Sequence, residues 1–156
     1  MSVTIRPFAR ADAEAVIALW LQAFPEYQDT TRPHRSPRLS IENKLGTQPE
    51  LFFVATRDED GAVVGTAMAG YDGHRGWLYS VAVDPAERRL GIGTGLVRHA
   101  ESQLAARGCP KLNLQVLRDK PEVLAFYEAL GYRADAVVSL GKRLERPMLA
   151  ITADAQ

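Results

Sequence analysis

The sequence predicts an α/β domain of the α+β type, in which a mostly antiparallel central sheet of about six to seven strands is flanked by about four helices. Short apolar segments with period-two alternation recur along the chain, and longer segments carry apolar residues at helical spacing. In the middle of the chain, a strand-like segment runs through a glycine-rich turn directly into an amphipathic helix. No regular βα repeat follows this unit, so a doubly wound parallel sheet is not expected.

The N-terminal part of the chain predicts one strand and two helices. Residues 3 to 8 have the composition of a short strand, and residues 12 to 24 carry apolar side chains at helical spacing. Pro25 ends this helix, and the prolines and arginines of residues 25 to 38 indicate a loop. A short helix from about residue 37 to 46 is expected next. We interpret the basic loop as a solvated connection rather than as a lid that attracts an acidic acceptor.

Three strands follow, and their short connections predict an antiparallel meander. The predicted strands span residues 51 to 56, 63 to 71 and 77 to 83. The third strand is apolar on both faces, so it is expected to lie in the centre of the sheet. Strict alternation would place Leu78, Ser80 and Ala82 on one face of this strand and Tyr79, Val81 and Val83 on the other.

The C-terminal half predicts two more helices and three more strands. The periodicity indicates a helix over residues 92 to 107, a strand over 112 to 116 and a helix from about 121 to 131. A final hairpin is expected over residues 132 to 139 and 143 to 151, followed by a loose tail at 152 to 156.

Length and composition limit the possible classes of protein. A chain of 156 residues fits one domain spanning residues 1 to 156. Nineteen basic and nineteen acidic residues cancel, so no global field attracts nucleic acid or an anionic membrane. Cys109 is the single cysteine, which excludes an internal disulfide and gives no thiolate cluster for a metal. No segment has the ~20 apolar residues of a spanning helix. We therefore expect a cytoplasmic monomer or homodimer without metal, membrane or nucleic-acid partners.

The glycine-rich turn predicts an anion site. Gly91, Gly93 and Gly95 lie at the start of the long helix, directly after two arginines. Glycine leaves the backbone bare, so unpaired N–H groups and the positive end of the helix dipole face outward together. A phosphate binds well at such a helix start. The spacing lacks the GxxxxGK[ST] of a Walker loop, and a dinucleotide fingerprint would require a glycine where Leu96 stands.

Motifs in the second half of the chain resemble the GNAT superfamily of acetyl-CoA-dependent N-acetyltransferases. RRLGIG at residues 88 to 93 is similar to that family's [Q/R]xxGxG signature, within a segment that resembles its fourth strand, pyrophosphate loop and third helix. LNLQV at 112 to 116 resembles its fifth strand, and FYEALGY at 126 to 132 the helix and turn that close the cofactor site. Three shorter motifs, GYDGHRGWLY, RGCPK and SLGKRL, are similar to a bacterial subgroup, the YpeA-type acetyltransferases.

This resemblance implies a GNAT fold with a mixed, mostly antiparallel sheet and acetyl-CoA as co-substrate. In that fold the fourth and fifth strands part, and the pantetheine arm lies between them like an additional strand. Lys120 stands where many relatives have an asparagine that contacts the cofactor, so it is a further candidate. The implied cofactor-binding residues are Val81, Ala82, Val83, Arg88, Arg89, Gly91, Ile92, Gly93, Thr94, Gly95 and Lys120.

Tyr127 in FYEALGY matches the tyrosine with which GNAT enzymes protonate the leaving thiolate. A phenol with a pKa near ~10 is still protonated at neutral pH and is able to donate that proton. The resemblance therefore implies that Tyr127 is catalytic. Candidates for contact with the acceptor are Tyr71, Asp72, His74 and Tyr79, none of which the sequence singles out as the general base.

The predicted function is transfer of an acetyl group from acetyl-CoA to a primary amine by direct attack within a ternary complex. The acceptor is either a small amine metabolite or the α-amine or a lysine of a protein. The alternative is a module that binds acetyl-CoA as a sensor or scaffold without turnover. Tyr127 argues against this alternative, because binding alone requires no proton donor.

Overall fold

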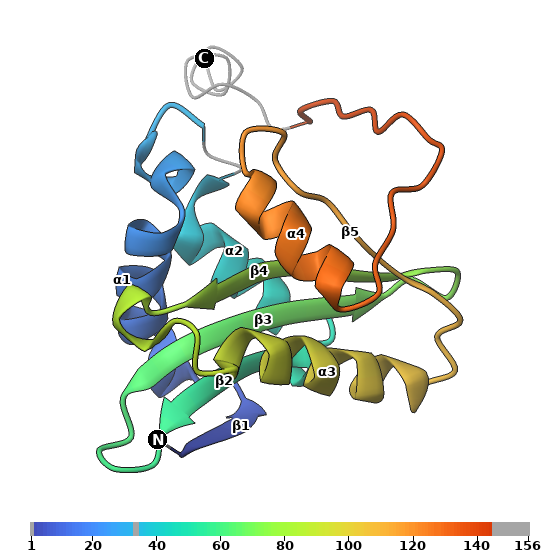
Figure 1. Cartoon of the computed structure of the whole chain (residues 1–156). Helices are drawn as coiled ribbons and strands as arrows, with labels where there is room; N and C mark the ends of the chain where they lie inside the picture. The colour runs from blue at the N-terminus through green and yellow to red at the C-terminus, as the bar shows by residue number, and fades with distance from the viewer. Residues whose placement is uncertain (1, 33–34, 145–156) are drawn as a thin grey trace, which may run out of the picture.

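The computed structural model describes residues 2 to 32 and 35 to 144. Its sheet has the order β1-β2-β3-β4-β5, in which the first four strands are antiparallel neighbours and β5 runs parallel to β4 (Figure 1). The mixed α/β sheet is confirmed, but it has five strands among the described residues rather than six to seven. The strands are β1 (Val3–Pro7), β2 (Phe52–Arg57), β3 (Val63–Tyr71), β4 (Gly76–Val83) and β5 (Leu112–Leu114).

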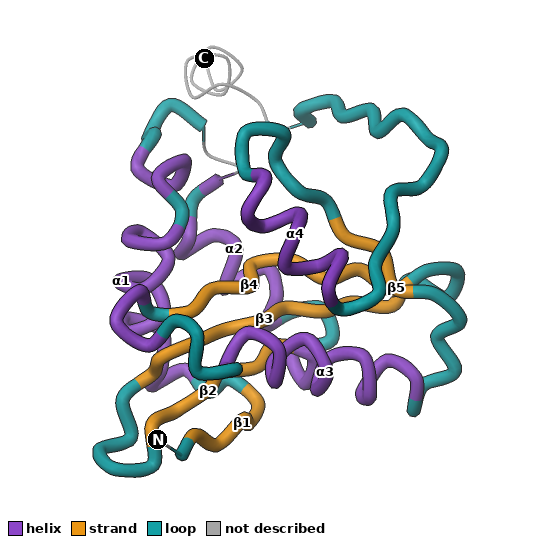
Figure 2. Tube along the Cα trace, in the orientation of Figure 1, coloured by secondary structure: helices purple, strands orange, loops and turns teal. Residues whose placement is uncertain are grey.

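The α-helices of the described residues cover both faces of this sheet (Figure 2). They are α1 (Ala13–Ala23), α2 (Pro37–Leu45), α3 (Ile92–Ala105) and α4 (Pro121–Ala129). Side chains of β2 alternate between the faces: Phe53 and Ala55 pack in the core under α3 and α4, whereas Phe52 and Val54 pack in the core under α1 and α2. β2 and β3 are buried on both faces, which explains why their sequences are mostly apolar. β4 was expected to be central, but it lies next to the edge strand β5, and its Trp77 and Tyr79 side chains are exposed.

The pairing of β4 with β5 is short. It comprises Gly76 with Leu112, Trp77 with Asn113 and Leu78 with Leu114. Beyond Leu78 the two strands part, as the resemblance implied. Residues 79 to 83 pair with β3 on one side only, and no described strand pairs with their other edge. The backbone N–H and C=O groups on that edge are therefore available to a bound molecule.

A β-bulge interrupts β4 at this parting. The register with β3 shifts between Thr66 and Met68, and Ser80 has a positive φ of 53°. An extra residue reverses the alternation of side chains along a strand. Leu78 consequently packs in the same core as Val81 and Val83. The expectation that Leu78 and Val81 occupy opposite faces was wrong for this reason.

Two buried side chains hold the bulge in place. The Trp20 Nε1–H of α1 donates to Thr66 Oγ1 over 2.8 Å, and the Thr66 hydroxyl donates to the Ser80 carbonyl oxygen over 2.9 Å. Trp20 and Thr66 have no exposed surface. The Thr66 hydroxyl thus satisfies the Trp20 N–H donor and the Ser80 carbonyl acceptor, which would otherwise lack partners.

Replacement of Thr66 by valine is expected to lower the free energy of unfolding by about 2 to 6 kcal/mol, because two polar groups then lose their partners at about 1 to 3 kcal/mol each. Urea denaturation measures this change. Thr56→Val is the matched control, since the Thr56 hydroxyl makes only one long bond of 3.4 Å to the Thr4 carbonyl oxygen. Equal losses in the two variants would contradict the anchoring role of Thr66.

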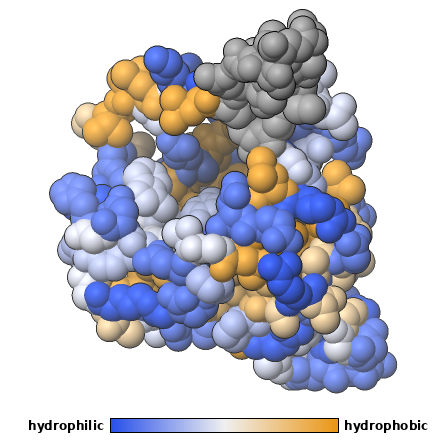
Figure 3. Space-filling view, turned by 180° about the vertical axis from the view of Figure 1, so that it is seen from behind, coloured by the Kyte–Doolittle hydropathy of each residue, from blue (hydrophilic) through white to orange (hydrophobic). Residues whose placement is uncertain are grey.

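The predicted C-terminal hairpin is not formed in the described part of the chain. Residues 132 to 144 are a loop, and the remainder of the predicted second strand and tail lies outside the described residues. Side-chain contacts, such as the 2.9 Å ion pair between Lys111 and Asp135, link this loop to the chain around β5 in place of a backbone ladder. Hydrophobic surface appears at the upper left of Figure 3, and the exposed apolar residues of the loop are Val137, Val138, Leu140 and Leu144.

Candidate acetyl-transfer site

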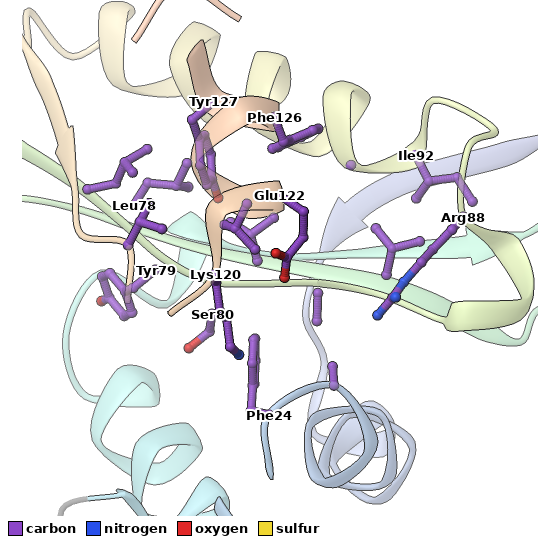
Figure 4. A pocket seen from close by; sticks show the side chains of 18 of the residues that line it. Phe24, Leu78, Tyr79, Ser80, Arg88, Ile92, Lys120, Glu122, Phe126 and Tyr127 are labelled. Atoms are coloured by element: carbon purple, nitrogen blue, oxygen red, sulfur yellow. The ribbon is translucent and has the colours of Figure 1, made fainter. Parts of the chain in front are cut away.

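A cavity of about 680 Å³ lies where β4 and β5 part (Figure 4). β4 and the loop before α3 form one wall, and α4 with the residues after β5 forms another. The end of α1 closes a third side through Ala23 and Phe24. The strand edge without a partner and the start of α3 therefore face the same space.

The loop before α3 presents free backbone donors to this cavity. Arg89 and Gly91 have positive φ angles of 68° and 80°, which turn the chain sharply into the helix. Gly95 is the first residue here whose amide donates to the backbone, over 2.9 Å to the Gly91 oxygen. Among the described residues, no acceptor lies within hydrogen-bonding geometry of the amides of residues 88 to 94. Successive free amides at a helix start form a concave anion site.

Most of the residues predicted to bind the cofactor line this one cavity. They are Val81, Ala82, Val83, Arg88, Arg89, Gly91, Ile92, Gly93, Thr94 and Lys120. Gly95 does not line the cavity, because it faces β1. A Cβ atom on Gly95 would lie 3.5 Å from Ile5 Cδ1. The structure therefore gives Gly95 a packing role between α3 and β1.

Tyr127 projects from α4 with its hydroxyl directed into the cavity (Figure 4). The ring is held by edge-on contacts with Phe126 and Tyr132, at centroid distances of 4.9 and 5.6 Å. Only 7% of the residue is exposed, and burial raises the pKa of the phenol to about 12. The hydroxyl therefore keeps its proton over the whole neutral and mildly alkaline range.

Charges around the cavity are divided between paired and unpaired groups. Glu87 forms an ion pair with Arg57, and Lys120 Nζ lies 4.0 Å from the Glu26 carboxylate. Arg88 and Arg89 have no carboxylate partner in the described part of the chain. Arg88 and Arg89 therefore supply the positive charge beside the free amides.

The predicted acceptor contacts divide between two cavities. Tyr79 lines both the first cavity and a second one of about 700 Å³, which Tyr71 and Asp72 also line. His74 lines neither of them. The Asp72 carboxylate accepts hydrogen bonds from the amides of His74 and Arg75, at 2.8 and 2.7 Å, which lower its pKa. Asp72 therefore stabilises the turn and is a weak base.

Sequence reasoning missed Lys44, which lies in the second cavity beside Tyr79. Lys44 is three residues after the buried Ile41 on α2, so it occupies the core-facing side of that helix. A lysine at a core-facing position was the available signal. The helix is only nine residues long, and such a short segment gives a weak periodic pattern.

The "Acetyltransferase (GNAT) family" model matches residues 13 to 132, so the chain belongs to the GNAT family of acetyltransferases. It is therefore an acyltransferase. A protein named acetyltransferase from Yersinia enterocolitica is 46% identical over 140 residues, which cover 90% of this chain and 94% of the relative. An uncharacterized N-acetyltransferase from Yersinia pestis is 45% identical over the same shares of the two chains.

Solved structures show the same fold. The PaiA N-acetyltransferase from Thermoplasma acidophilum, in complex with coenzyme A, has a TM-score of 0.75 at 19% identity, with 88% of this chain and 94% of that chain covered. The ribosomal-protein-S18-alanine N-acetyltransferase from Escherichia coli has a TM-score of 0.67 at 25% identity, with 83% and 77% covered. Within the described residues, no helix is both long and apolar enough to cross a membrane.

Proposed function

We propose that this protein transfers the acetyl group of acetyl-CoA to a primary amine by direct attack within a ternary complex. The observation that carries the proposal is the meeting of three features in one cavity: an unpaired strand edge, a run of free amides and a buried phenol. The strand edge suits the amide-bearing pantetheine arm, and the free amides suit a diphosphate. The phenol suits a leaving thiolate, which needs a proton.

In the proposed mechanism, the diphosphate of acetyl-CoA binds the amides of residues 88 to 94, with Arg88 and Arg89 adding charge. The pantetheine arm pairs with β4 at Val81 and Val83. This pairing brings the thioester to the bulge at Ser80, where a backbone N–H is the donor to the carbonyl oxygen. Free amides that are already fixed in place require no reorganisation when an oxyanion forms.

The neutral amine then attacks the thioester carbonyl, and a tetrahedral intermediate forms. Its oxyanion is stabilised by a backbone N–H of residues 80 to 82. When the C–S bond breaks, the electron pair stays on sulfur and Tyr127 supplies the proton, so that free coenzyme A leaves. The amine nitrogen loses its extra proton to a base or to water, and the products are an N-acetylated amine and a thiol.

Release of free thiol from acetyl-CoA tests this proposal. Purified protein is incubated with acetyl-CoA and, in turn, with pooled polyamines, amino acids, aminoglycosides and short peptides. We expect one pool to raise thiol release above the rate without acceptor, and mass spectrometry to find the acetylated amine in that pool. Binding of acetyl-CoA without thiol release from any pool would contradict transfer to these amines and favour a binding module.

A further inference from the structure

The second cavity contains a buried ammonium group without a counter-ion. Lys44 is only 5% exposed, and its Nζ donates to the Ala69 carbonyl oxygen over 2.6 Å. Among the described residues, no carboxylate lies within 4.0 Å of this Nζ. The nearby Glu50 is instead 3.8 Å from Arg107. A buried charge without an opposite charge is costly, so this arrangement suits a site that an anionic group completes on binding.

Three polar atoms from three segments converge above Gly70. A Cβ atom on Gly70 would lie 3.6 Å from Gln48 Oε1, 3.8 Å from Tyr79 Oη and 3.9 Å from Lys44 Nζ. Gln48 is fixed by two hydrogen bonds with the backbone of Tyr71, at 2.9 and 2.8 Å. Any larger residue at position 70 would project into the space between these atoms. Glycine therefore leaves room for a small ligand group there.

The free groups above Gly70 are donors. Burial lowers the pKa of Lys44 to about 8, while the charge of Glu50 acts in the opposite direction. The amine is still about ten to one protonated at pH 7, and one of its three N–H groups is used by Ala69. Burial raises the pKa of Tyr79, so its hydroxyl also keeps a proton. Gln48 Oε1 already accepts the Tyr71 amide proton.

Lys44 and Tyr79 thus offer a positive charge and two separate donors, which match the two oxygens of a carboxylate. The second cavity also adjoins the first. Leu78, Tyr79, Ser80 and Gln115 line both. A group held above Gly70 therefore lies on the path along β4 that leads to the bulge at Ser80.

We propose that the second cavity binds the carboxylate of the acceptor through Lys44 and Tyr79, so that the acceptor is an amino acid or another small amine that carries a carboxylate. This inference rests on the proposed acetyl transfer. It selects among the acceptor classes, because polyamines and aminoglycosides have no anionic group for this site.

Binding of reaction products tests the site without turnover. N-acetyl amino acids and their uncharged carboxamides are titrated into the protein saturated with coenzyme A, and affinity is measured by calorimetry. We expect at least one acid to bind roughly tenfold more tightly than its carboxamide, as hydrogen bonds to a charged group require. Lys44→Met should abolish this preference, Lys44→Arg should restore part of it, and Lys142→Met, which changes an exposed lysine, should have no effect.

Turnover of the corresponding unacetylated amino acids and amino-acid carboxamides completes the test. Each amino acid is compared with its carboxamide as acceptor, and Lys44→Met should lower kcat/KM for the acid at least roughly tenfold more than for the carboxamide. Tyr79→Phe should have a smaller effect in the same direction. The KM for acetyl-CoA should stay unchanged in Lys44→Met, because Lys44 lines only the second cavity.

The outcomes separate this inference from the proposed function. Turnover of uncharged amines alone, or equal losses for acid and carboxamide in Lys44→Met, would overturn the carboxylate site and leave acetyl transfer standing. Binding of acids that depends on Lys44, without any thiol release, would support the carboxylate site and overturn the proposed acetyl transfer. Absence of both acid binding and thiol release would overturn both.

Discussion

Replacement of Tyr127 by phenylalanine is expected to lower kcat about 100-fold, at the lower end of the effect of a general acid, and to leave the affinity for acetyl-CoA unchanged. The hydroxyl is directed into the cavity, whereas the ring packs against Phe126 and Tyr132. Phenylalanine keeps the ring contacts and removes only the hydroxyl that is the proposed proton donor. Steady-state thiol release gives kcat, and calorimetric titration of acetyl-CoA gives the affinity.

The pKa of Tyr127 also fixes the expected pH dependence. Burial raises this pKa to about 12, so the protonated form persists well above the ordinary tyrosine pKa near ~10. Loss of activity between pH 8 and 10 should therefore arise from a group other than Tyr127.

Tyr132→Phe is the control for the Tyr127→Phe variant. The Tyr132 ring also packs against Tyr127, but its hydroxyl donates to Glu101 over 2.7 Å. An equal fall in kcat in both variants would indicate loss of packing rather than loss of a proton donor.

Local patterns in the sequence were sufficient for much of the fold and for many of the residues that line the candidate site. The span of β3 and the start of α3 agree with the predicted residues, since alternation and helical spacing are local signals. The glycines after Arg89 predicted a turn with free amides, because glycine leaves the backbone bare at the start of the helix. Tyr127, which the resemblance to a known motif implied to be catalytic, lines the same cavity.

The failures have a common physical origin in long-range contacts. The bulge at Ser80 depends on hydrogen bonds from Trp20 and Thr66, which lie far away in the chain, so counting alternate residues along β4 did not reveal it. The predicted strand over residues 132 to 139 had suitable composition, but a strand also needs a partner. β5 ends at Leu114, which leaves that segment without a backbone ladder.

Lys44 illustrates the same limit at the site. Its proposed role depends on Ala69, Gly70 and Tyr79, which belong to two strands distant from α2 in sequence. A single sequence shows that a lysine lies on the apolar side of a short helix, but it does not show which groups the ammonium contacts. Only the packed structure relates Lys44 to the edge of β4 where acetyl transfer is proposed.

Replacement of Gly93 by glutamate is expected to raise the Kd for acetyl-CoA at least about 100-fold, because a carboxylate would stand beside the site of the diphosphate and like charges in contact cost several kcal/mol. A Cβ atom on Gly93 would lie 3.4 Å from Phe126 Cζ and 3.5 Å from Val83 Cγ2. These distances allow a methyl group, so Gly93→Ala should change the Kd only a few-fold. Calorimetric titration with acetyl-CoA gives the Kd of the unmodified protein and of both Gly93 variants.

Two controls separate charge at the loop from damage to the fold. Gly141→Glu adds the same charge at an exposed position, where a Cβ atom has no neighbour within 4 Å, and its Kd should match that of the unmodified protein. Circular dichroism and thermal unfolding must show that Gly93→Glu is folded. A folded Gly93→Glu protein with unchanged affinity would mean that the diphosphate does not bind at the start of α3. Weakened binding in Gly93→Glu alone would support the free amides of residues 88 to 94 as its binding site, since the added carboxylate opposes an anion only there.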